Sequence, residues 1–150
     1  MAEYLANAVQ TVNLNEAAIF TASIPCTRGF IYHADETGVF ILRGITTCGP
    51  ARYEVDLDAN IALPEGADIT PIALAITENG EIRPTSRGIS TPAAVEEYNQ
   101  VHCSATIVVP QGCCFTVAIE AVSGNTPPAT DIPEPALLMQ NANLKIKRTA

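Results

Sequence analysis

The sequence has little charge and few aromatic side chains. Only 16% of its 150 residues are charged and 5% are aromatic, with no tryptophan, whereas 47% are hydrophobic. A chain this apolar can offset the entropy lost on ordering by burying side chains, which excludes an intrinsically disordered protein. Its length suits one domain. Because a surface with few charges costs little to desolvate, we expect the protein to associate with further copies of itself.

Clustered cations are also lacking. The formal net charge is −8, and all 16 acidic residues lie between Glu3 and Glu134, whereas Lys145, Lys147 and Arg148 stand near the end. Nucleic acids are bound by clustered Lys and Arg side chains, so the composition argues against a nucleic-acid partner. We expect the three terminal cations to lie on a solvated or subunit-facing side of a strand.

Long hydrophobic runs are absent. No apolar stretch approaches the roughly 20 residues that a membrane-spanning helix needs, so we predict no membrane partner. The N-terminus carries Glu3 where a secretory signal requires cations. We therefore expect synthesis in the cytoplasm without export.

The sequence lacks the usual catalytic and cofactor motifs. Its serines stand in no Gly-x-Ser-x-Gly context, and no glycine-rich phosphate loop is present. Its adjacent carboxylates, such as Glu96 and Glu97, are ordinary on a solvated surface. We therefore predict that the protein is not an enzyme, and we assign it no catalytic residue, no cofactor and no metal.

Two metal sites remain as less favoured alternatives. His33 is interpreted as a polar residue at a strand end, but it could share a metal with Cys26 or Cys48, although the closely spaced ligand pairs of structural zinc are missing. Asp56 and Asp58 lie two apart on one strand face and could bind calcium, although the EF-hand pattern is missing.

The five cysteines do not form a disulfide pattern. Their number is odd, and thiols stay reduced in the cytoplasm, so we expect most of Cys26, Cys48, Cys103, Cys113 and Cys114 to be small buried residues. Cys113 and Cys114 are neighbours in an expected strand, where successive side chains point to opposite faces. We expect one of them in the core and the other exposed or at an interface. A bond between Cys26 and Cys48 stays open.

The sequence is rich in short β-type runs, separated by turn residues every eight to twelve positions. This spacing predicts an all-β antiparallel sandwich of about ten strands. In the run 51–58, apolar and polar residues alternate strictly, so one face is buried and the other is acidic. Asn79 and Gly80 predict a hairpin turn. Strands are expected at 9–20, 29–33, 38–43, 51–58, 69–77, 82–86, 101–109, 113–121 and 141–148, with 29–33 paired to 38–43 and with 101–109 and 113–121 forming a hairpin.

The remaining segments predict arms, loops and one helical turn. Residues 1–7 are expected as an N-terminal arm, followed by a single domain over 8–150. At most one short helical turn is expected near 92–98, because Thr91 suits a helix N-cap and Pro92 the first helical position. Four prolines within 125–135 predict an exposed ordered loop.

Four segments carry a resemblance to a known family: Ile72–Glu81, Thr91–Tyr98, Thr106–Gly112 and Gln140–Ile146. They resemble the tumour-necrosis-factor-like and complement-globular-head-like trimeric jelly-roll domains of Firmicutes and their phages. The resemblance implies a jelly roll that closes into a homotrimer, with the N-terminal and C-terminal strands adjacent on the inner sheet.

The same resemblance suggests several functions. The chain has neither the Gly-X-Y stalk nor the export signal of the bacterial surface members, which favours a phage capsid decoration (cement) trimer, located in the virion and bound to the major capsid protein. The alternatives are a receptor-binding or glycan-binding head and a self-assembling surface filament subunit. Sugars often stack on aromatic side chains, and their scarcity here disfavours the hypothesis of a glycan-binding head.

Strand phase predicts which residues would form the trimer interface. His102, Ser104 and Thr106 alternate with apolar neighbours, and so do Asn141 and Asn143 in the last strand. If the resemblance holds, these five side chains form a neutral polar face between subunits.

Overall fold

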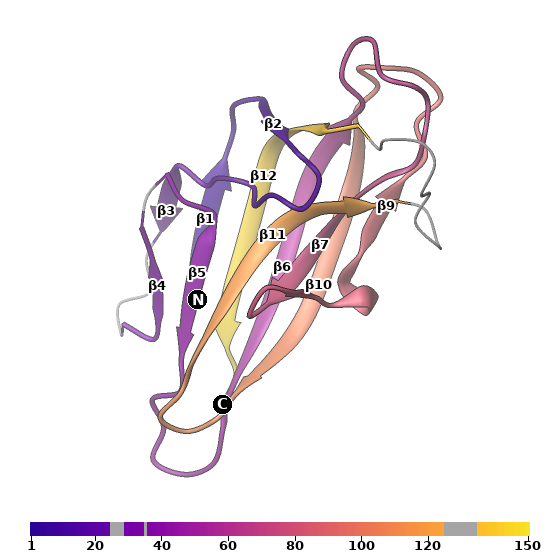
Figure 1. Ribbon diagram of the computed structural model, residues 1–150. Helices are drawn as coiled ribbons and strands as arrows, with labels where there is room; N and C mark the ends of the chain where they lie inside the picture. Colours follow the sequence, from indigo (N-terminus) through magenta and orange to yellow (C-terminus); the bar gives the residue numbers. More distant parts are fainter. Residues whose placement is uncertain (25–28, 35, 125–134) are drawn as a thin grey trace.

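Two antiparallel six-stranded sheets pack face to face in the computed structural model, which describes residues 1–24, 29–34, 36–124 and 135–150 (Figure 1). The order of the first sheet is β10-β6-β12-β1-β3, with β2 beside β12, and the order of the second is β4-β5-β11-β7-β8, with β9 beside β7. The strands are β1 (Ala2–Ala6), β2 (Gln10–Val12), β3 (Ala22–Ile24), β4 (Ile31–His33), β5 (Val39–Arg43), β6 (Ala51–Ala62), β7 (Ile72–Glu78), β8 (Glu81–Ile82), β9 (Gly88–Ser90), β10 (Asn99–Val109), β11 (Cys114–Ser123) and β12 (Leu137–Arg148). The prediction of an all-β antiparallel sandwich is confirmed.

One hydrophobic core fills the space between the two sheets. In β6 the alternation read from the sequence holds, since Tyr53, Val55 and Leu57 are completely buried while their neighbours point outward. Residues of the second sheet such as Leu42 and Ile119 close the core from the other side. The rest of the first sheet's side chains, on its opposite face, are therefore available for another role.

Several local predictions are confirmed. β4 and β5 form an antiparallel pair. β7 is buried on both faces up to its last residue, as its continuous apolar run indicates. Asn79 and Gly80 have φ values of 52° and 84°, the left-handed backbone that an Asn-Gly hairpin turn requires. By contrast, the strand expected over 82–86 is mostly wrong: β8 lies at the sheet edge but ends at Ile82, and Pro84–Ser86 form the 3-10 turn η1, because Pro84 has no N–H to continue the ladder.

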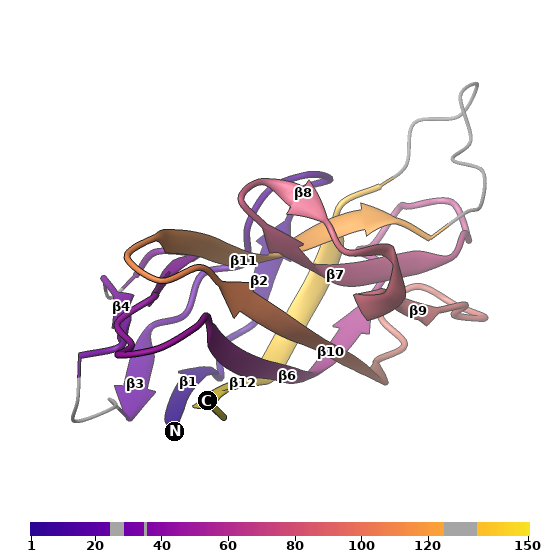
Figure 2. The same ribbon diagram turned by 90° about the horizontal axis from the view of Figure 1, so that it is seen from below.

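The predicted hairpin of 101–109 with 113–121 is wrong. β10 pairs with β6 in the first sheet, whereas β11 pairs with β5 and β7 in the second (Figure 2). The turn after Val109 therefore carries the chain from one sheet to the other. Alternation and a Pro-Gln-Gly turn are the same for a hairpin and for a sheet crossing, so these local signals cannot separate the two.

The N-terminal segment is a strand instead of a free arm. β1 lies between β12 and β3, and Ala2, Tyr4 and Ala6 are buried in the core. Its pairing with β12 matches the expected adjacency of the N-terminal and C-terminal strands. Five residues of alternating burial are too short a signal to separate a strand from an arm.

Two other segments differ from expectation, and one is not described. Residues 92–98 contain bends and a turn but no helix; Glu96 has a φ of 57° and donates its N–H to Leu63 O. The run 9–20 is a strand only in β2, after which Leu14 and Ala17 form isolated bridges to β11. The proline-rich segment falls almost wholly on 125–134, outside the described residues. Within the described part of the chain, no helix is long and apolar enough to cross a membrane.

Candidate functional site: the free face of the first sheet

The side chains of the first sheet that point away from the core form what we call the free face. It runs across β10, β6, β12 and β1, since successive residues of each strand alternate between the core and this face. Its members include Glu3, Leu5, Arg52, Glu54, Asp56, Asp58, Asn60, Gln100, His102, Ser104, Thr106, Val108, Asn141, Asn143, Lys145 and Lys147. All five residues predicted for a subunit interface are among them.

His102 lies at the centre of a polar cluster on this face. Its Nδ1 is 2.9 Å from Asp58 Oδ1, and its Nε2 is 3.8 Å from Asp56 Oδ1. The pairing of β10 with β6 places His102 directly opposite Asp58, which explains the contact. All three side chains are about half exposed, so the cluster can make further contacts.

Charges on the free face are arranged in columns that follow the strands. β6 supplies Glu54, Asp56 and Asp58, and β12 supplies Lys145 and Lys147. The register sets Lys145 opposite Asp56 and Lys147 opposite Glu54. The expectation of a neutral face is therefore wrong. It was based on residues of β10 and β12, and the acidic strand β6 lies between these two strands. The acidic alternation of 51–58 was the signal that could have revealed it.

A bulge in β12 positions the two asparagines. The register of β12 against β6 shifts between Gln140 and Asn143, and Asn141 has a φ of 51°. Asn141 is exposed, whereas Asn143 is half-buried and donates from Nδ2 to Glu3 Oε1 at 2.5 Å. Asn143 of β12 and His102 of β10 are the register partners of Asp58 on its two sides, so these two predicted residues flank Asp58.

The free face continues around the edge of β10 into an open hollow of about 560 Å³. Its walls include Glu54 and Asp56 of β6, Ser104 and Thr106 of β10, Arg83 just before η1 and Thr85 within it. Arg83 also donates to Glu78 Oε2 at 2.6 Å. The hollow is lined by charged and hydroxyl groups and can accept a polar side chain.

The alternative metal sites gain no support from the geometry. The Nε2 of His33 is 2.9 Å from Thr37 O, and its ring stacks on Phe40 with centroids 4.3 Å apart, as suits a polar residue at a strand end. Asp58 is engaged by His102. Over residues 1–24, 29–34, 36–124 and 135–150, no group of three His, Cys, Asp or Glu side chains is placed to hold a metal ion. Cys26 lies outside these ranges.

The cysteine predictions are largely wrong. Of the four cysteines that the structure describes, only Cys103 is buried, and its thiol donates to Leu74 O at 3.3 Å; Cys48, Cys113 and Cys114 are exposed. β11 begins at Cys114, so Cys113 lies in the turn and the alternation rule does not apply to the pair. The terminal cations also divide: Lys145 and Lys147 lie on the free face, whereas the Arg148 guanidinium packs 4.0 Å over the Phe30 ring.

Comparisons with known proteins identify the fold. No family model matches the chain, and no curated protein matches its sequence. Among solved structures, the chain is similar to the globular domain of a zebrafish complement 1qA protein, with a TM-score of 0.61 and 14% identity over 97% of this chain and 92% of that one. It is also similar to the Eiger TNF of S. frugiperda, with a TM-score of 0.63 and 11% identity over 100% and 92% of the two chains.

The fold is a jelly roll of the complement and tumour-necrosis-factor type. Murine APRIL matches less closely, with a TM-score of 0.53 and 10% identity over 96% of each chain. The jelly-roll prediction is confirmed. Identities this low carry the fold alone, so the use of the free face has to be argued from its own residues.

Proposed function

We propose that this jelly roll is a non-enzymatic homotrimer whose free faces lie between the subunits. The observation that carries the proposal is the arrangement of the free face in columns of opposite charge, acidic on β6 and basic on β12. In a closed ring of three, each copy uses two different patches. The acidic column and hollow of one copy can then face Lys145 and Lys147 of the next, which gives the contact electrostatic complementarity.

The five residues predicted from strand phase take part in this proposal as hydrogen-bonding groups. His102, Ser104 and Thr106 border the acidic column and Asn141 and Asn143 border the lysine column. A face of hydroxyl, amide and paired charged groups is polar for a permanent interface, and it fits a contact in which hydrogen bonds fix the register.

Native mass spectrometry and light scattering test the trimer. We expect a mass of three chains, and we expect Glu54→Gln with Asp56→Asn to raise the monomer fraction at equal concentration. The matched control is Glu65→Gln with Glu97→Gln, which removes the same charge from two exposed loop residues off the free face. A parent chain that stays monomeric at high concentration contradicts the trimer. A trimer that tolerates the Glu54 and Asp56 changes as well as the control contradicts the role of the free face.

We further propose that the trimer decorates a phage capsid and contacts the major capsid protein. The low charge content and the jelly-roll fold support a structural role on a particle surface. Co-sedimentation of the purified protein with virions tests this step. We expect the protein in the particle band at a fixed ratio to the capsid protein, and its absence from purified particles contradicts the decoration role without touching the trimer.

The open hollow supports a second candidate function, a receptor-binding or glycan-binding head. Carboxylates, hydroxyls and the Arg83 guanidinium line a space of about 560 Å³, and such groups hydrogen-bond sugars. A glycan array probed with the parent and with Thr85→Arg, which fills the hollow, separates the two candidates. Binding that Thr85→Arg abolishes supports the head, and an array without hits contradicts it.

A further inference from the structure

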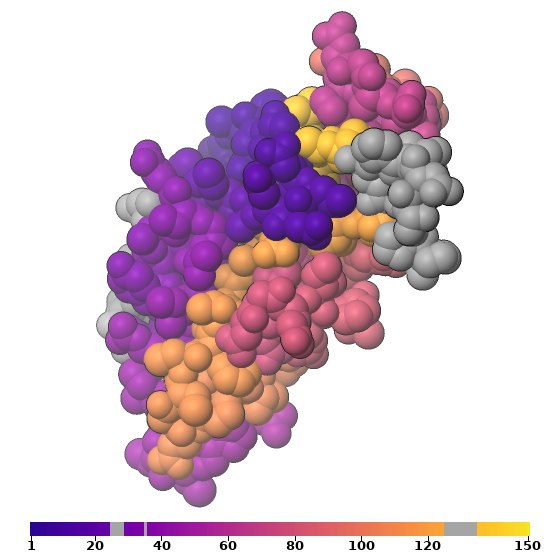
Figure 3. All heavy atoms as spheres, viewed as in Figure 1, coloured from indigo at the N-terminus to yellow at the C-terminus, as the bar shows by residue number. Residues whose placement is uncertain are grey.

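Two loops meet at one end of the sandwich and carry two of the three exposed thiols of the described residues. Residues 44–50 connect β5 to β6, and residues 110–113 connect β10 to β11 (Figure 3). Gly44 N donates to Cys113 O at 2.7 Å, Gly112 N donates to Gly44 O at 2.9 Å, and Gln111 Nε2 donates to Thr46 O at 3.1 Å. We call these loops, together with Cys114, the thiol pole.

Hydrogen bonds hold the thiol pole in a defined shape. The hydroxyl of Thr46 accepts the N–H of Cys48 at 3.0 Å and so orders the turn that presents this cysteine. The Arg148 guanidinium donates to Ile45 O at 2.6 Å and ties the same loop to the end of β12. The cysteines at this end of the sandwich therefore lie on loops that hydrogen bonds hold in place.

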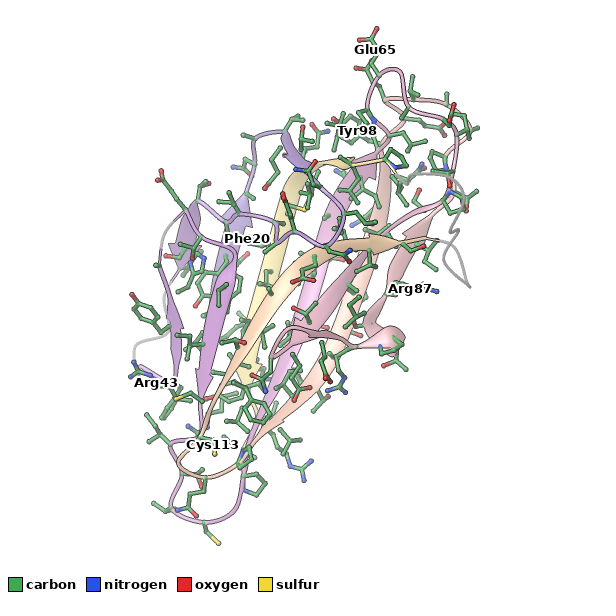
Figure 4. All side chains as sticks on the ribbon, viewed as in Figure 1. Phe20, Arg43, Glu65, Arg87, Tyr98 and Cys113 are labelled. Carbon is green, nitrogen blue, oxygen red and sulfur yellow. The ribbon has the colours of Figure 1, made fainter. Side chains whose placement is uncertain are left out.

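The exposure of three thiols here is unusual for their residue type. Cysteine is among the residues most often buried, yet Cys48, Cys113 and Cys114 are all exposed (Figure 4 labels Cys113 at this end). They contribute nothing to the core, in contrast to Cys103. Thiols that do not serve packing are available for reaction.

Bonding between the two adjacent cysteines is disfavoured by geometry. Neighbouring Cα atoms lie about 3.8 Å apart across a trans peptide bond, whereas disulfides usually join Cα atoms about 4.4 to 6.8 Å apart. Cys113 and Cys114 therefore suit partners from elsewhere.

The charge distribution favours a second copy of this chain as that partner. The chain carries a net charge of −8, so most approaches between copies are repulsive. Residues 44–50 and 110–113 contain no charged side chain, and Ile45 adds an apolar contact that is 53% exposed. Two copies can meet at this end with no charged side chain in either loop, and each brings the same thiols to a self-complementary contact. The cations beside the loops are Arg148, which donates to Ile45 O, and Arg43, which pairs with Cys114.

We propose that the thiol pole is a covalent cross-linking site at which Cys48, Cys113 and Cys114 form disulfides with the same pole of a second copy. The oxidant is a small-molecule disulfide. A thiolate of one chain attacks it, forming a mixed disulfide and releasing one small thiol; a thiolate of the second chain then attacks the protein sulfur, forming the interchain bond and releasing the other small thiol. Two protein thiols are oxidised and one small disulfide is reduced to two thiols. The site does not depend on the trimer, because it lies at the end of the sandwich and not on the free face.

Oxidation of the full chain with oxidised glutathione tests the proposal. We expect linked dimers and larger species on non-reducing electrophoresis, all reversed by dithiothreitol. Mixing isotope-labelled with unlabelled chains and mapping the disulfide peptides should find interchain bonds at the three pole cysteines. The variant with Cys48, Cys113 and Cys114 all changed to Ser should lose the linked species while keeping its fold by circular dichroism.

A matched pair of variants tests the position of the thiol. One retains Cys113 alone at the pole (Cys48→Ser, Cys114→Ser), and the other adds Glu65→Cys to the triple serine variant, which puts one exposed thiol at the opposite end (Figure 4). The Cys113 chain should cross-link faster. Equal rates for the two, disulfides found only within one chain, or glutathione adducts without linked chains would each overturn the proposal.

Discussion

The imidazole of His102 bridges two carboxylates of the neighbouring strand, with Nδ1 2.9 Å from Asp58 Oδ1 and Nε2 3.8 Å from Asp56 Oδ1. The bridge joins β10 at the sheet edge to β6. These three side chains form a polar cluster on the free face, where the proposed neighbour would pack.

A double-mutant cycle on His102 and Asp58 should give a small coupling energy in the isolated chain. Both side chains are more than half exposed, and ion pairs of this kind contribute about 0.2 to 1 kcal/mol. We expect urea unfolding of His102→Ala, Asp58→Ala and the double variant to give a coupling in this range that falls when salt is added. The cycle on Thr106 and Glu54, which are also register partners, serves as control. A coupling well above this range at low protein concentration would contradict an exposed pair.

The buried thiol of Cys103 should make the protein lose stability in alkali. Burial raises its pKa from 9.0 to about 11, assisted by the charge of Asp58 and opposed by a hydrogen bond from the Gly88 backbone. The unfolded chain releases this proton near pH 9 and the folded chain only near pH 11. The stabilisation is therefore complete below pH 9 and is lost as the pH rises to 11.

Comparison with Cys103→Ala measures this loss. A difference of about two pKa units corresponds to roughly 2 to 3 kcal/mol. Urea unfolding under reducing conditions at pH 8 and pH 10.5 should show the parent losing more stability than Cys103→Ala, by an amount approaching that figure. The remaining cysteines, tyrosines and lysines are common to both chains, so parallel losses would contradict a thiol kept neutral by burial.

The sequence predicted side-chain directions and two local hairpins, but it gave the wrong partner for β10. His102, Ser104 and Thr106 point outward as expected, because alternation depends only on the neighbouring backbone. That β10 pairs with β6 and not with β11 depends on contacts between distant segments, on which alternation gives no information. Two-residue periodicity is equally consistent with either pairing.

The errors about the free face and the cysteines follow from the same limit. The acidic side chains of β6 were evident in the sequence, but only the strand order places them between His102 and Lys145. β11 begins at Cys114, which pairs with Arg43 of β5, so the predicted strand 113–121 starts one residue too early. Knowledge of the strand order would have corrected the first prediction, and a register known to one residue would have corrected the second.

Gly44 should be intolerant of any side chain, because the crossing between the sheets passes directly over it. A Cβ at Gly44 would lie 2.1 Å from Pro110 O and 3.0 Å from Cys113 O, which are backbone atoms that cannot rotate away. We expect Gly44→Ala to cost about 3 kcal/mol or more, at the upper end of what overpacking causes. The control Gly49→Ala lies in the same loop with open space around it but a φ of +72°, so only backbone strain of about 1 to 2 kcal/mol is expected. Thermal unfolding of the two variants should separate them, and equal losses would show that the connection yields at Gly44.

Ser86 should stabilise β7 beside the hollow, because its hydroxyl takes the place of a neighbouring strand as the hydrogen-bond acceptor for Ile76. Its hydroxyl accepts the Ile76 N–H at 3.0 Å and donates to Arg83 O at 2.6 Å, in the gap where η1 separates β8 from β9. Ser86→Ala leaves the buried Ile76 N–H without this acceptor, which costs about 1 to 3 kcal/mol. The exposed neighbour provides the control, since Thr85→Ala should stay within about 0.5 kcal/mol of the parent. Hydrogen exchange should locate the effect, with faster exchange at Ile76 in Ser86→Ala alone. If the Ile76 amide exchanges as slowly as in the parent, the Ser86 hydroxyl is not the acceptor that protects it.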